Sequence, residues 1–312
     1  MSLTLYWVVG GGCDGDSMSL LNMESPDLLE LVEMLDIEVL WHPSLSPINI
    51  GDLRKCNERL FSGEQQLDLL ILEGAVVRGP SGTGMYDTLD GQPKKKTIYD
   101  LANVAQVVLA VGTCASFGGI SADSDIEATG LQFLKRKKGG FLGENFIARG
   151  GNPVINLPGC PCHPDVVRGA LTALASGIKL ELDQYHRPLE WYGMFVHQGC
   201  TRNEYHEYRV EEAEFGERGC LFFNMGCHGP LSHGTCNKLL WNRRSSKTRV
   251  GVPCFGCTQP DFPEPFPFFE TRNIEGIPIA LPEEMSRAHY MAYKGLAAAA
   301  APERLIKRKT RI

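Results

Sequence analysis

Short, almost wholly apolar runs recur through the first half of the chain and are typical of strands buried on both faces. The runs that we predict as strands are Leu3–Val9, Ile37–Trp41, Leu67–Leu72, Gln106–Val111 and Pro153–Leu157. Between them, apolar positions recur at helical spacing, which predicts helices over Pro26–Leu35, over Thr97–Val104 and from Pro164 onward. Because strands alternate with helices, the sequence predicts an α/β fold with a doubly wound parallel sheet.

The alternating pattern fades from about residue 180. The later part contains Gly226–Pro230 and the proline-rich Pro260–Pro267, and it shows little sustained periodicity. Such a segment cannot easily build a core from apolar packing alone, whereas bound metal would supply the missing constraint. We therefore predict two domains, an α/β domain over residues 1–180 and an irregular, mostly helical or coil domain that binds metal over residues 181–312.

Three cysteines stand directly after predicted strands. Cys13 follows the first strand, Cys114 follows the fourth and Cys160 follows the fifth. In a doubly wound sheet, ligands bind beyond the carboxyl ends of the strands. The fold would therefore bring together three thiolates that are far apart in the sequence.

A cubane iron–sulfur cluster usually takes four thiolates, so a fourth ligand is expected close to these three. Asp16 is separated from Cys13 by two residues, a spacing at which one loop often supplies two ligands. A carboxylate can coordinate iron, although it is harder than thiolate and would alter the redox behaviour of the cluster. The alternative is that Asp16 caps the next turn and that Cys162 or water is the fourth ligand.

The second half carries a dense group of soft ligands. His197 and Cys200 form a His-x-x-Cys pair. The cysteines that follow are Cys220, Cys227, Cys236, Cys254 and Cys257. Structural zinc sites prefer compact pairs of cysteines, and here only the last two form a Cys-x-x-Cys unit. The spacing therefore favours iron–sulfur clusters, with zinc as the alternative.

The composition narrows the class of protein. The 312 residues carry a formal net charge of −6, which argues against a general nucleic-acid binder. Eleven cysteines in a cytosolic chain favour metal ligands or catalysts over disulfides. The first residues lack the features of a signal peptide, and no apolar run approaches the length needed to cross a bilayer. We therefore expect a cytoplasmic protein, unless a leader has been removed.

Taken together, the motifs resemble the small subunit of NiFe hydrogenases. The resemblance extends over nearly the whole chain, in the same order. It rests on Cys13, Gly112-Thr113-Cys114, Pro158-Gly159-Cys160-Pro161, His197-x-x-Cys200, Gly226-Cys227-x-Gly229-Pro230 and Pro253-Cys254-x-x-Cys257. The resemblance implies a flavodoxin-like first domain, an irregular cluster-binding second domain and a relay of three iron–sulfur clusters.

The resemblance also implies a ligand set for each cluster. The proximal 4Fe–4S cluster would be held by Cys13, Asp16, Cys114 and Cys160. The distal 4Fe–4S cluster would be held by His197, Cys200, Cys220 and Cys227. The medial cluster, either 4Fe–4S or 3Fe–4S, would be held by Cys236, Cys254 and Cys257. A fourth medial ligand would fall near Lys247, and Cys162 is an open candidate either for that ligand or for inert packing.

Asp16 stands where most family members carry a cysteine. This departure resembles the actinobacterial-type subgroup of oxygen-insensitive, high-affinity uptake hydrogenases. No cysteine pairs in the chain resemble those that hold the NiFe centre, so the resemblance implies a large partner subunit that contains the catalytic site. We accordingly expect no catalytic residue in this chain.

The expected function is that of the electron-transfer small subunit of an uptake hydrogenase, which passes electrons from H2 oxidation to an unidentified acceptor. The expected assembly is a dimer of heterodimers, without a direct membrane span and without nucleic acid. One alternative is the small subunit of a hydrogen-sensing regulatory hydrogenase. Others are a zinc-stabilised interaction module and the single-cluster subunit of a quinone reductase.

Three features lie outside the ligand sets. Glu73 ends a predicted strand, and we interpret it as a cap or as an interface ion pair. Cys56 has no counterpart in the family and is interpreted as structural. The end of the chain, Ala297–Ala301 followed by Pro302–Lys309, is too short and too basic to span a membrane and is expected to be a solvated tail.

Overall fold

The computed structural model describes residues 2–122, 124–265, 267–282 and 285–306. Contacts within the chain define two compact units. The first comprises Met1–Glu190 with Thr258–Pro263, and the second comprises Trp191–Cys257 with Glu264–Ile312. The units therefore meet in the sequence at residue 190, slightly later than the change of pattern, and a short later segment belongs to the first unit.

The first unit is built on a five-stranded parallel sheet. Its strands are β1 (Leu3–Val9), β2 (Ile37–Trp41), β3 (Leu67–Glu73), β7 (Ala105–Val111) and β11 (Ile155–Leu157). They lie in the order β11-β7-β3-β1-β2, and every pair is parallel. Counted in chain order this is 2-1-3-4-5, the flavodoxin-like arrangement. The predicted α/β fold with a doubly wound parallel sheet is confirmed.

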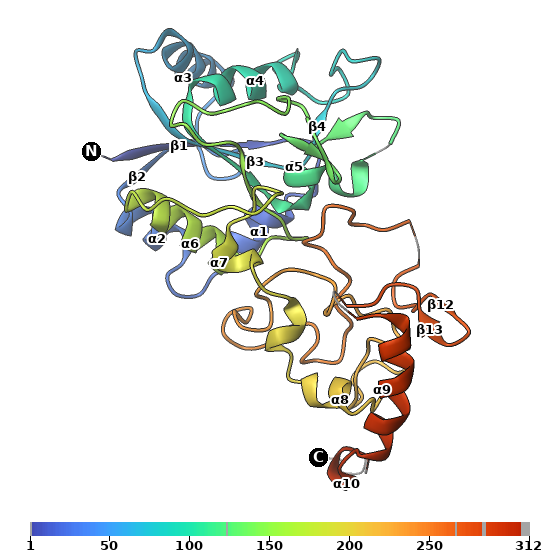
Figure 1. Ribbon diagram of the computed structural model, residues 1–312. Coiled ribbons are helices and arrows are strands. Elements are labelled where there is room, and N and C mark those ends of the chain that lie inside the picture. The colour runs from blue at the N-terminus through green and yellow to red at the C-terminus, as the bar shows by residue number, and fades with distance from the viewer. Residues whose placement is uncertain (1, 123, 266, 283–284, 307–312) are drawn as a thin grey trace. The chain divides into compact units, whose positions relative to one another are not determined.

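The strands are apolar because helices cover both faces of the sheet. Side chains such as Leu70, Leu72 and Val108 are fully buried, as expected for a covered parallel sheet. Figure 1 shows two helices over one face, α3 (Ile50–Ser62) and α4 (Lys94–Val104), and two over the other, α2 (Leu28–Met34) and α6 (Pro164–Ala175).

Local sequence fixes the start of α2. The predicted helix began at Pro26, whereas the observed helix begins at Leu28. The reason is a capping box in which the carboxylate of Asp27 accepts from the backbone N–H of Glu30, and the carboxylate of Glu30 accepts from that of Asp27. Helix α4 begins at Lys94, earlier than the predicted Thr97.

Three helices of the first unit were not predicted. Helices α1 (Gly15–Leu21) and α5 (Gly112–Phe117) directly follow sheet strands and their loops. They are only seven and six residues long, too short to show a helical repeat of apolar positions. Helix α3 is longer, and the side chain of Asn49 caps it by accepting from the N–H groups of Gly51 and Asp52.

Short two-stranded ladders complete the first unit, together with a turn of 3-10 helix over Gly119–Ser121. The ladders pair β4 (Val76–Val77) with β8 (Ala128–Thr129), β5 (Thr88–Leu89) with β6 (Gln92–Pro93), and β9 (Phe133–Leu134) with β10 (Lys137–Lys138).

The second unit has little regular structure up to its C-terminal helices. A small core forms around Leu221, Phe222 and Met225, and two cysteines, Cys220 and Cys227, are part of it. Its regular elements, with α7 at the boundary between the units, are α7 (Leu189–Tyr192), a 3-10 turn (Val196–Gly199), α8 (Asn203–Glu207), β12 (Asn273–Ile274), β13 (Ile277–Pro278), α9 (Arg287–Ala299) and α10 (Glu303–Ile306).

The C-terminal helices pack partly against the rest of the second unit, whereas most described residues of the expected solvated tail are exposed, as expected. Tyr290 and Ala297 of α9 and Leu305 of α10 are buried. Arg304 forms an ion pair with Glu204 of α8. Residues 307–309 of the expected tail lie outside the described residues. No helix in the described part of the chain is both long and apolar enough to cross a bilayer.

Candidate metal centres

The fold places the three cysteines of the first unit at the carboxyl edge of its sheet, as the topology requires. Cys13 lies between β1 and α1, Cys114 lies in α5 directly after β7, and Cys160 follows β11. Burial raises the pKa of the Cys114 thiol, and the charges of Asp16 and Cys13 raise it further. These groups therefore lie within electrostatic reach of one another.

Helix α1 is capped from the neighbouring strand by Glu73, which is 1% exposed. Its carboxylate accepts from the backbone N–H of Asp16 at 2.8 Å, from that of Ser17 at 3.1 Å, and from the Ser17 hydroxyl at 2.5 Å. The indole N–H of Trp7 also donates to it, at 3.2 Å. Glu73 therefore caps α1, which was one of its two interpretations. The side chain of the N-cap residue, Asp14, makes no capping bond, and the carboxylate of Asp16 accepts from Cys162 in a separate loop.

The carboxylate of Asp16 is buried and is directed at the loop that carries Cys160 and Cys162. Its Oδ1 accepts from the backbone N–H of Cys162 at 2.6 Å. Burial, partly offset by this hydrogen bond and reinforced by the charge of Glu73, raises the pKa of Asp16 to about 7. Burial removes the hydration that would stabilise the carboxylate, and a nearby cation can replace that stabilisation. Asp16 is therefore better suited to bind a metal than an acid on the surface would be.

Glycine provides the space that Asp16 occupies. A Cβ on Gly112 would stand 2.1 Å from Oδ2 of Asp16, and the φ of Gly112 is +85°. A Cβ on Gly119 would likewise stand 2.5 Å from Sγ of Cys114. The backbone therefore approaches two of the expected ligand atoms so closely that no other side chain fits, which is the packing expected around a compact cluster.

Cys162 belongs to the loop that carries Cys160 and is 1% exposed. Its thiol donates to the carbonyl of His163 at 3.7 Å, and its own carbonyl accepts from the hydroxyl of Ser19 at 3.0 Å. With the bond to Asp16, these contacts tie the Cys160 loop to α1. Cys162 therefore packs within the first unit, whereas the expected medial cysteines are all in the second. Cys56 is also buried, in the core around β1 and β3.

The four expected distal ligands line one cavity in the second unit. They are His197, Cys200, Cys220 and Cys227. Burial raises the pKa of Cys220 to about 12 and that of Cys227 to about 11. Protons on these thiols would have to be replaced by iron, because a cluster takes thiolates. The arrangement provides a shared concave site for one histidine and three cysteines that are spread over thirty-one positions, 197 to 227.

The loops that carry these ligands are held by backbone bonds and by one arginine. The N–H of His197 donates to the carbonyl of Gly229, and the N–H of Cys200 donates to that of His197. The guanidinium of Arg202 donates to the carbonyls of Thr248 and Gly219, at 2.7 Å in each case. The sequence analysis did not single out Arg202. The only feature that could have indicated it is its position two residues after the expected ligand Cys200.

The three expected medial cysteines also lie together. Burial raises the pKa of Cys254 well above its usual value, and Cys227, Cys257 and Cys236 raise it further. Burial and Cys257 raise the pKa of Cys236 to about 12, while Lys247 lowers it. The Nζ of Lys247 lies 3.8 Å from the ring centroid of Phe255. Lys247 therefore brings a cation near the medial cysteines at the place where a fourth ligand was sought.

The medial and distal sets are joined by a hydrogen bond. The backbone N–H of Cys254 donates to Sγ of Cys227 at 3.3 Å. The backbone N–H of His228, next to Cys227, donates to the carbonyl of Cys254 at 2.6 Å. Cys254 of the medial set is therefore in direct contact with Cys227 of the distal set.

A single metal ion makes a different demand, because all its ligands must converge on one point. Among the residues that the structure describes, no three His, Cys, Asp or Glu side chains do so. In a cluster each ligand binds a different iron atom, so the ligands surround a volume. The cavity lined by the distal set matches the second requirement.

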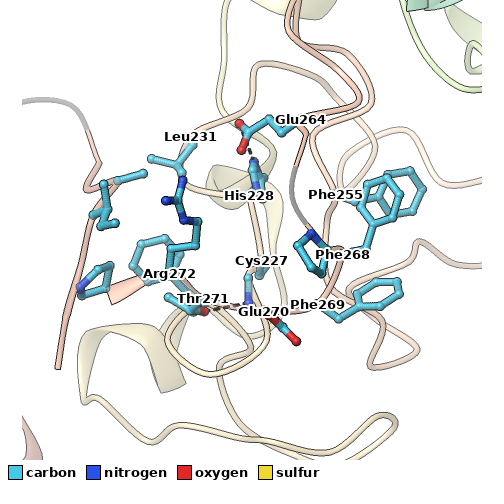
Figure 2. Close-up of a pocket in the computed structure, with 16 residues that line it drawn as sticks. Cys227, His228, Leu231, Phe255, Glu264, Phe268, Phe269, Glu270, Thr271 and Arg272 are labelled. Carbon is cyan, nitrogen blue, oxygen red and sulfur yellow. Dashed lines mark hydrogen bonds and ion pairs between the residues drawn. The ribbon is translucent and has the colours of Figure 1, made fainter. Parts of the chain in front are cut away.

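A larger pocket, open to solvent, lies beside the cavity of the distal set and shares Phe222 and Cys227 with it. Figure 2 shows aromatic side chains on one side, among them Phe255 and Phe268, and Arg272 on the other. The imidazole of His228 faces Glu264 at 3.8 Å.

Comparison with known proteins assigns the family. Residues 192–270 match the family model for the C-terminal region of the NiFe/NiFeSe hydrogenase small subunit. Residues 13–174 match the model for the 20 Kd subunit of NADH ubiquinone oxidoreductase. The chain is similar to the F420 non-reducing hydrogenase I small subunit of Methanosarcina mazei, with 35% identity over 83% of this chain and 73% of that protein. The periplasmic NiFeSe hydrogenase small subunit of Desulfomicrobium baculatum is 30% identical over 83% of this chain and 84% of its own length.

Among solved structures, the actinobacterial-type NiFe hydrogenase of Ralstonia eutropha is similar with a TM-score of 0.79 and 26% identity, over 100% of this chain and 94% of that one. The chain belongs to the NiFe hydrogenase small-subunit family. Members of this family carry iron–sulfur clusters, transfer electrons and pair with a hydrogenase large subunit. The hydrogenase model matches the second unit, so a quinone-reductase subunit that ends with the first unit does not describe this chain.

Proposed function

We propose that this chain is the electron-transfer small subunit of an uptake NiFe hydrogenase and holds three iron–sulfur clusters. When bound, such clusters supply one-electron carriers between the H2-oxidising site of the large subunit and an acceptor. The single observation that carries the proposal is that His197, Cys200, Cys220 and Cys227 line one cavity. Four soft ligands around one volume, in a unit with a small apolar core, favour a cluster that also holds the fold together.

The proximal ligands in this proposal are Cys13, Asp16, Cys114 and Cys160. Asp16 is buried, does not cap α1, and rests against Gly112 and the N–H of Cys162. The N–H of Cys162 fixes one carboxylate oxygen and leaves the other for a metal. Glu73 leaves Asp16 free for this role because it takes over the N–H groups at the start of α1.

The medial ligands in this proposal are Cys236, Cys254 and Cys257. Lys247 compensates part of the negative charge of these thiolates without being a ligand. The bond from Cys254 to Sγ of Cys227 supports a short route from the medial to the distal set. Whether the medial cluster contains three or four irons is decided by electron paramagnetic resonance of the oxidised and reduced protein.

We further propose an uptake enzyme of the oxygen-insensitive type, located in the cytoplasm as a dimer of heterodimers. Asp16 and the similarity to an actinobacterial-type enzyme support the subgroup. The regulatory alternative predicts slow turnover and a kinase that copurifies. Turnover with an artificial acceptor, together with the composition of the purified complex, separates the two.

The test is metal and sulfide analysis of the chain copurified with its large subunit. About four irons and four sulfides are expected for each cubane cluster. Zinc without acid-labile sulfide would overturn the proposal. Substitution Cys220→Ala should remove the distal cluster signal while the proximal signal remains, and loss of neither would refute the ligand assignment.

A further inference from the structure

His206 lies beside the distal ligand set without belonging to it. It is part of α8 and is 7% exposed. Its ring meets that of His197 edge-on, with 4.5 Å between the centroids. Its Nδ1 lies 3.4 Å from Sγ of Cys220. A buried imidazole therefore touches two of the expected ligands.

The neighbours of its two ring nitrogens define the position of the proton. A guanidinium nitrogen of Arg209 lies 3.4 Å from Nε2 of His206. A guanidinium can only donate, so Nε2 must accept, and a neutral imidazole then carries its proton on Nδ1. That N–H is directed at Sγ of Cys220, which accepts once it is a thiolate.

Arg209 is itself held by the C-terminal helix. Its guanidinium carbon lies 4.9 Å from the ring centroid of Tyr290 and 5.7 Å from that of Tyr293, both on α9. Cation–π contacts of this kind fix a guanidinium over an aromatic face. A continuous set of contacts thus leads from α9 through Arg209 and His206 to Cys220.

We propose that His206 is a positioning residue of the distal site, which donates an N–H···S hydrogen bond to Cys220 in a tautomer that Arg209 and α9 select. The inference rests on the proposed role of Cys220 as a cluster ligand. A hydrogen bond to a ligating sulfur withdraws negative charge and therefore favours the reduced cluster. His206 would raise the reduction potential of the distal cluster and draw electrons toward it.

The experiment measures the reduction potential of the distal cluster in the heterodimer. This cluster is identified by an electron paramagnetic resonance signal that shows coupling to a histidine nitrogen, because His197 is one of its proposed ligands. Substitution His206→Phe keeps a ring against His197 and removes the donor. In this variant we expect the equilibrium constant for reduction of the distal cluster to fall on the order of tenfold. A tenfold decrease corresponds to a reduction potential lower by about 59 mV for one electron. Substitution His206→Asn places an amide N–H near the position of Nδ1 and should restore most of the potential.

His206→Gln is the matched control, because its amide reaches toward the position of Nε2 instead. It should behave like His206→Phe. If the Phe variant loses the cluster, the comparison of Asn with Gln decides the matter. Equal potentials in the Asn and Gln variants, or an unchanged potential in an intact Phe variant, would overturn the role of His206.

Arg209 is tested by a double-mutant cycle. Arg209→Met should lower the potential of the distal cluster more in the native background than in the His206→Phe background. In the Phe variant no imidazole is present, so Arg209 acts on the cluster only through its own charge. Lys294→Met is the control. It removes a cation that α9 itself carries, whose Nζ lies 4.0 Å from the ring centroid of Phe223, and it should shift the potential equally in both backgrounds. Additive shifts for Arg209 would refute tautomer selection. Absence of any histidine-coupled cluster in the native heterodimer would instead refute the proposed function.

Discussion

The contact between Asp16 and Gly112 makes the proximal site sensitive to a single methyl group. In Gly112→Ala the added Cβ would stand 2.1 Å from Oδ2 of Asp16 and 2.8 Å from its Cγ. The residue would also hold a φ of +85°, which L side chains rarely adopt. Either the carboxylate of Asp16, an expected ligand, must move, or the backbone two residues before the expected ligand Cys114 must move.

The two effects can be separated in magnitude. A left-handed conformation costs a non-glycine residue roughly 1–2 kcal/mol. Overpacking in a well-packed interior costs typically about 1–3 kcal/mol more. Gly63→Ala is the matched control, since Gly63 has a φ of +80° and nothing within 4 Å of its added Cβ. We expect Gly112→Ala to lose roughly 2–5 kcal/mol of unfolding free energy and Gly63→Ala roughly 1–2 kcal/mol.

The assay is anaerobic thermal unfolding of the purified heterodimer, with iron analysis of the same samples. For a unit of this size, each kcal/mol lowers the melting temperature by about 2–4 °C. The excess loss in Gly112→Ala should therefore appear as a further decrease of roughly 2–12 °C, accompanied by loss of proximal iron. Equal melting temperatures and equal iron contents in the two variants would refute the contact between Asp16 and Gly112.

Three further changes test other parts of the assignment. Asp16→Cys should leave the protein folded and loaded with clusters but change the proximal potential or the tolerance of oxygen, and unchanged spectra with an unchanged oxygen response would show that Asp16 is not a ligand. His197→Ala should impair electron exit to an acceptor much more than hydrogen–deuterium exchange at the large subunit, and equal losses would contradict its distal position. Removal of iron by a chelator should abolish amide protection over Trp191–Cys257, whose small core includes Cys220 and Cys227, while β1, β3 and β7 stay protected. Protection that persists in both regions would refute the structural role of the clusters.

The sequence was sufficient for the sheet because each strand is a contiguous apolar run. Strands Leu3–Val9 and Ile37–Trp41 have the predicted bounds, and β3 and β7 are one residue longer than predicted. The last strand is shorter than predicted and begins at Ile155. Pro153 has no N–H to give to a ladder, which is consistent with a later start.

The ligand candidates could also be named from the sequence, because their residue types and their order along the chain are themselves the signal. The sequence left open whether Asp16 caps a turn, because the answer depends on Glu73, which lies fifty-seven positions away and is brought to α1 by the pairing of β1 with β3. Capping by Glu73 is a tertiary effect with no local signature.

Sequence alone determined the class of fold and the family, and it supplied the candidate ligands, since all three depend on short segments or on the order of motifs. Only the tertiary structure showed that Glu73 caps α1, that the C-terminal helix packs and holds Arg209, and that His206 faces Cys220. The physical reason is that hydrogen bonds and cation–π contacts depend on distances of a few ångströms between residues from separate elements. Folding sets those distances, and no local pattern in the chain encodes them.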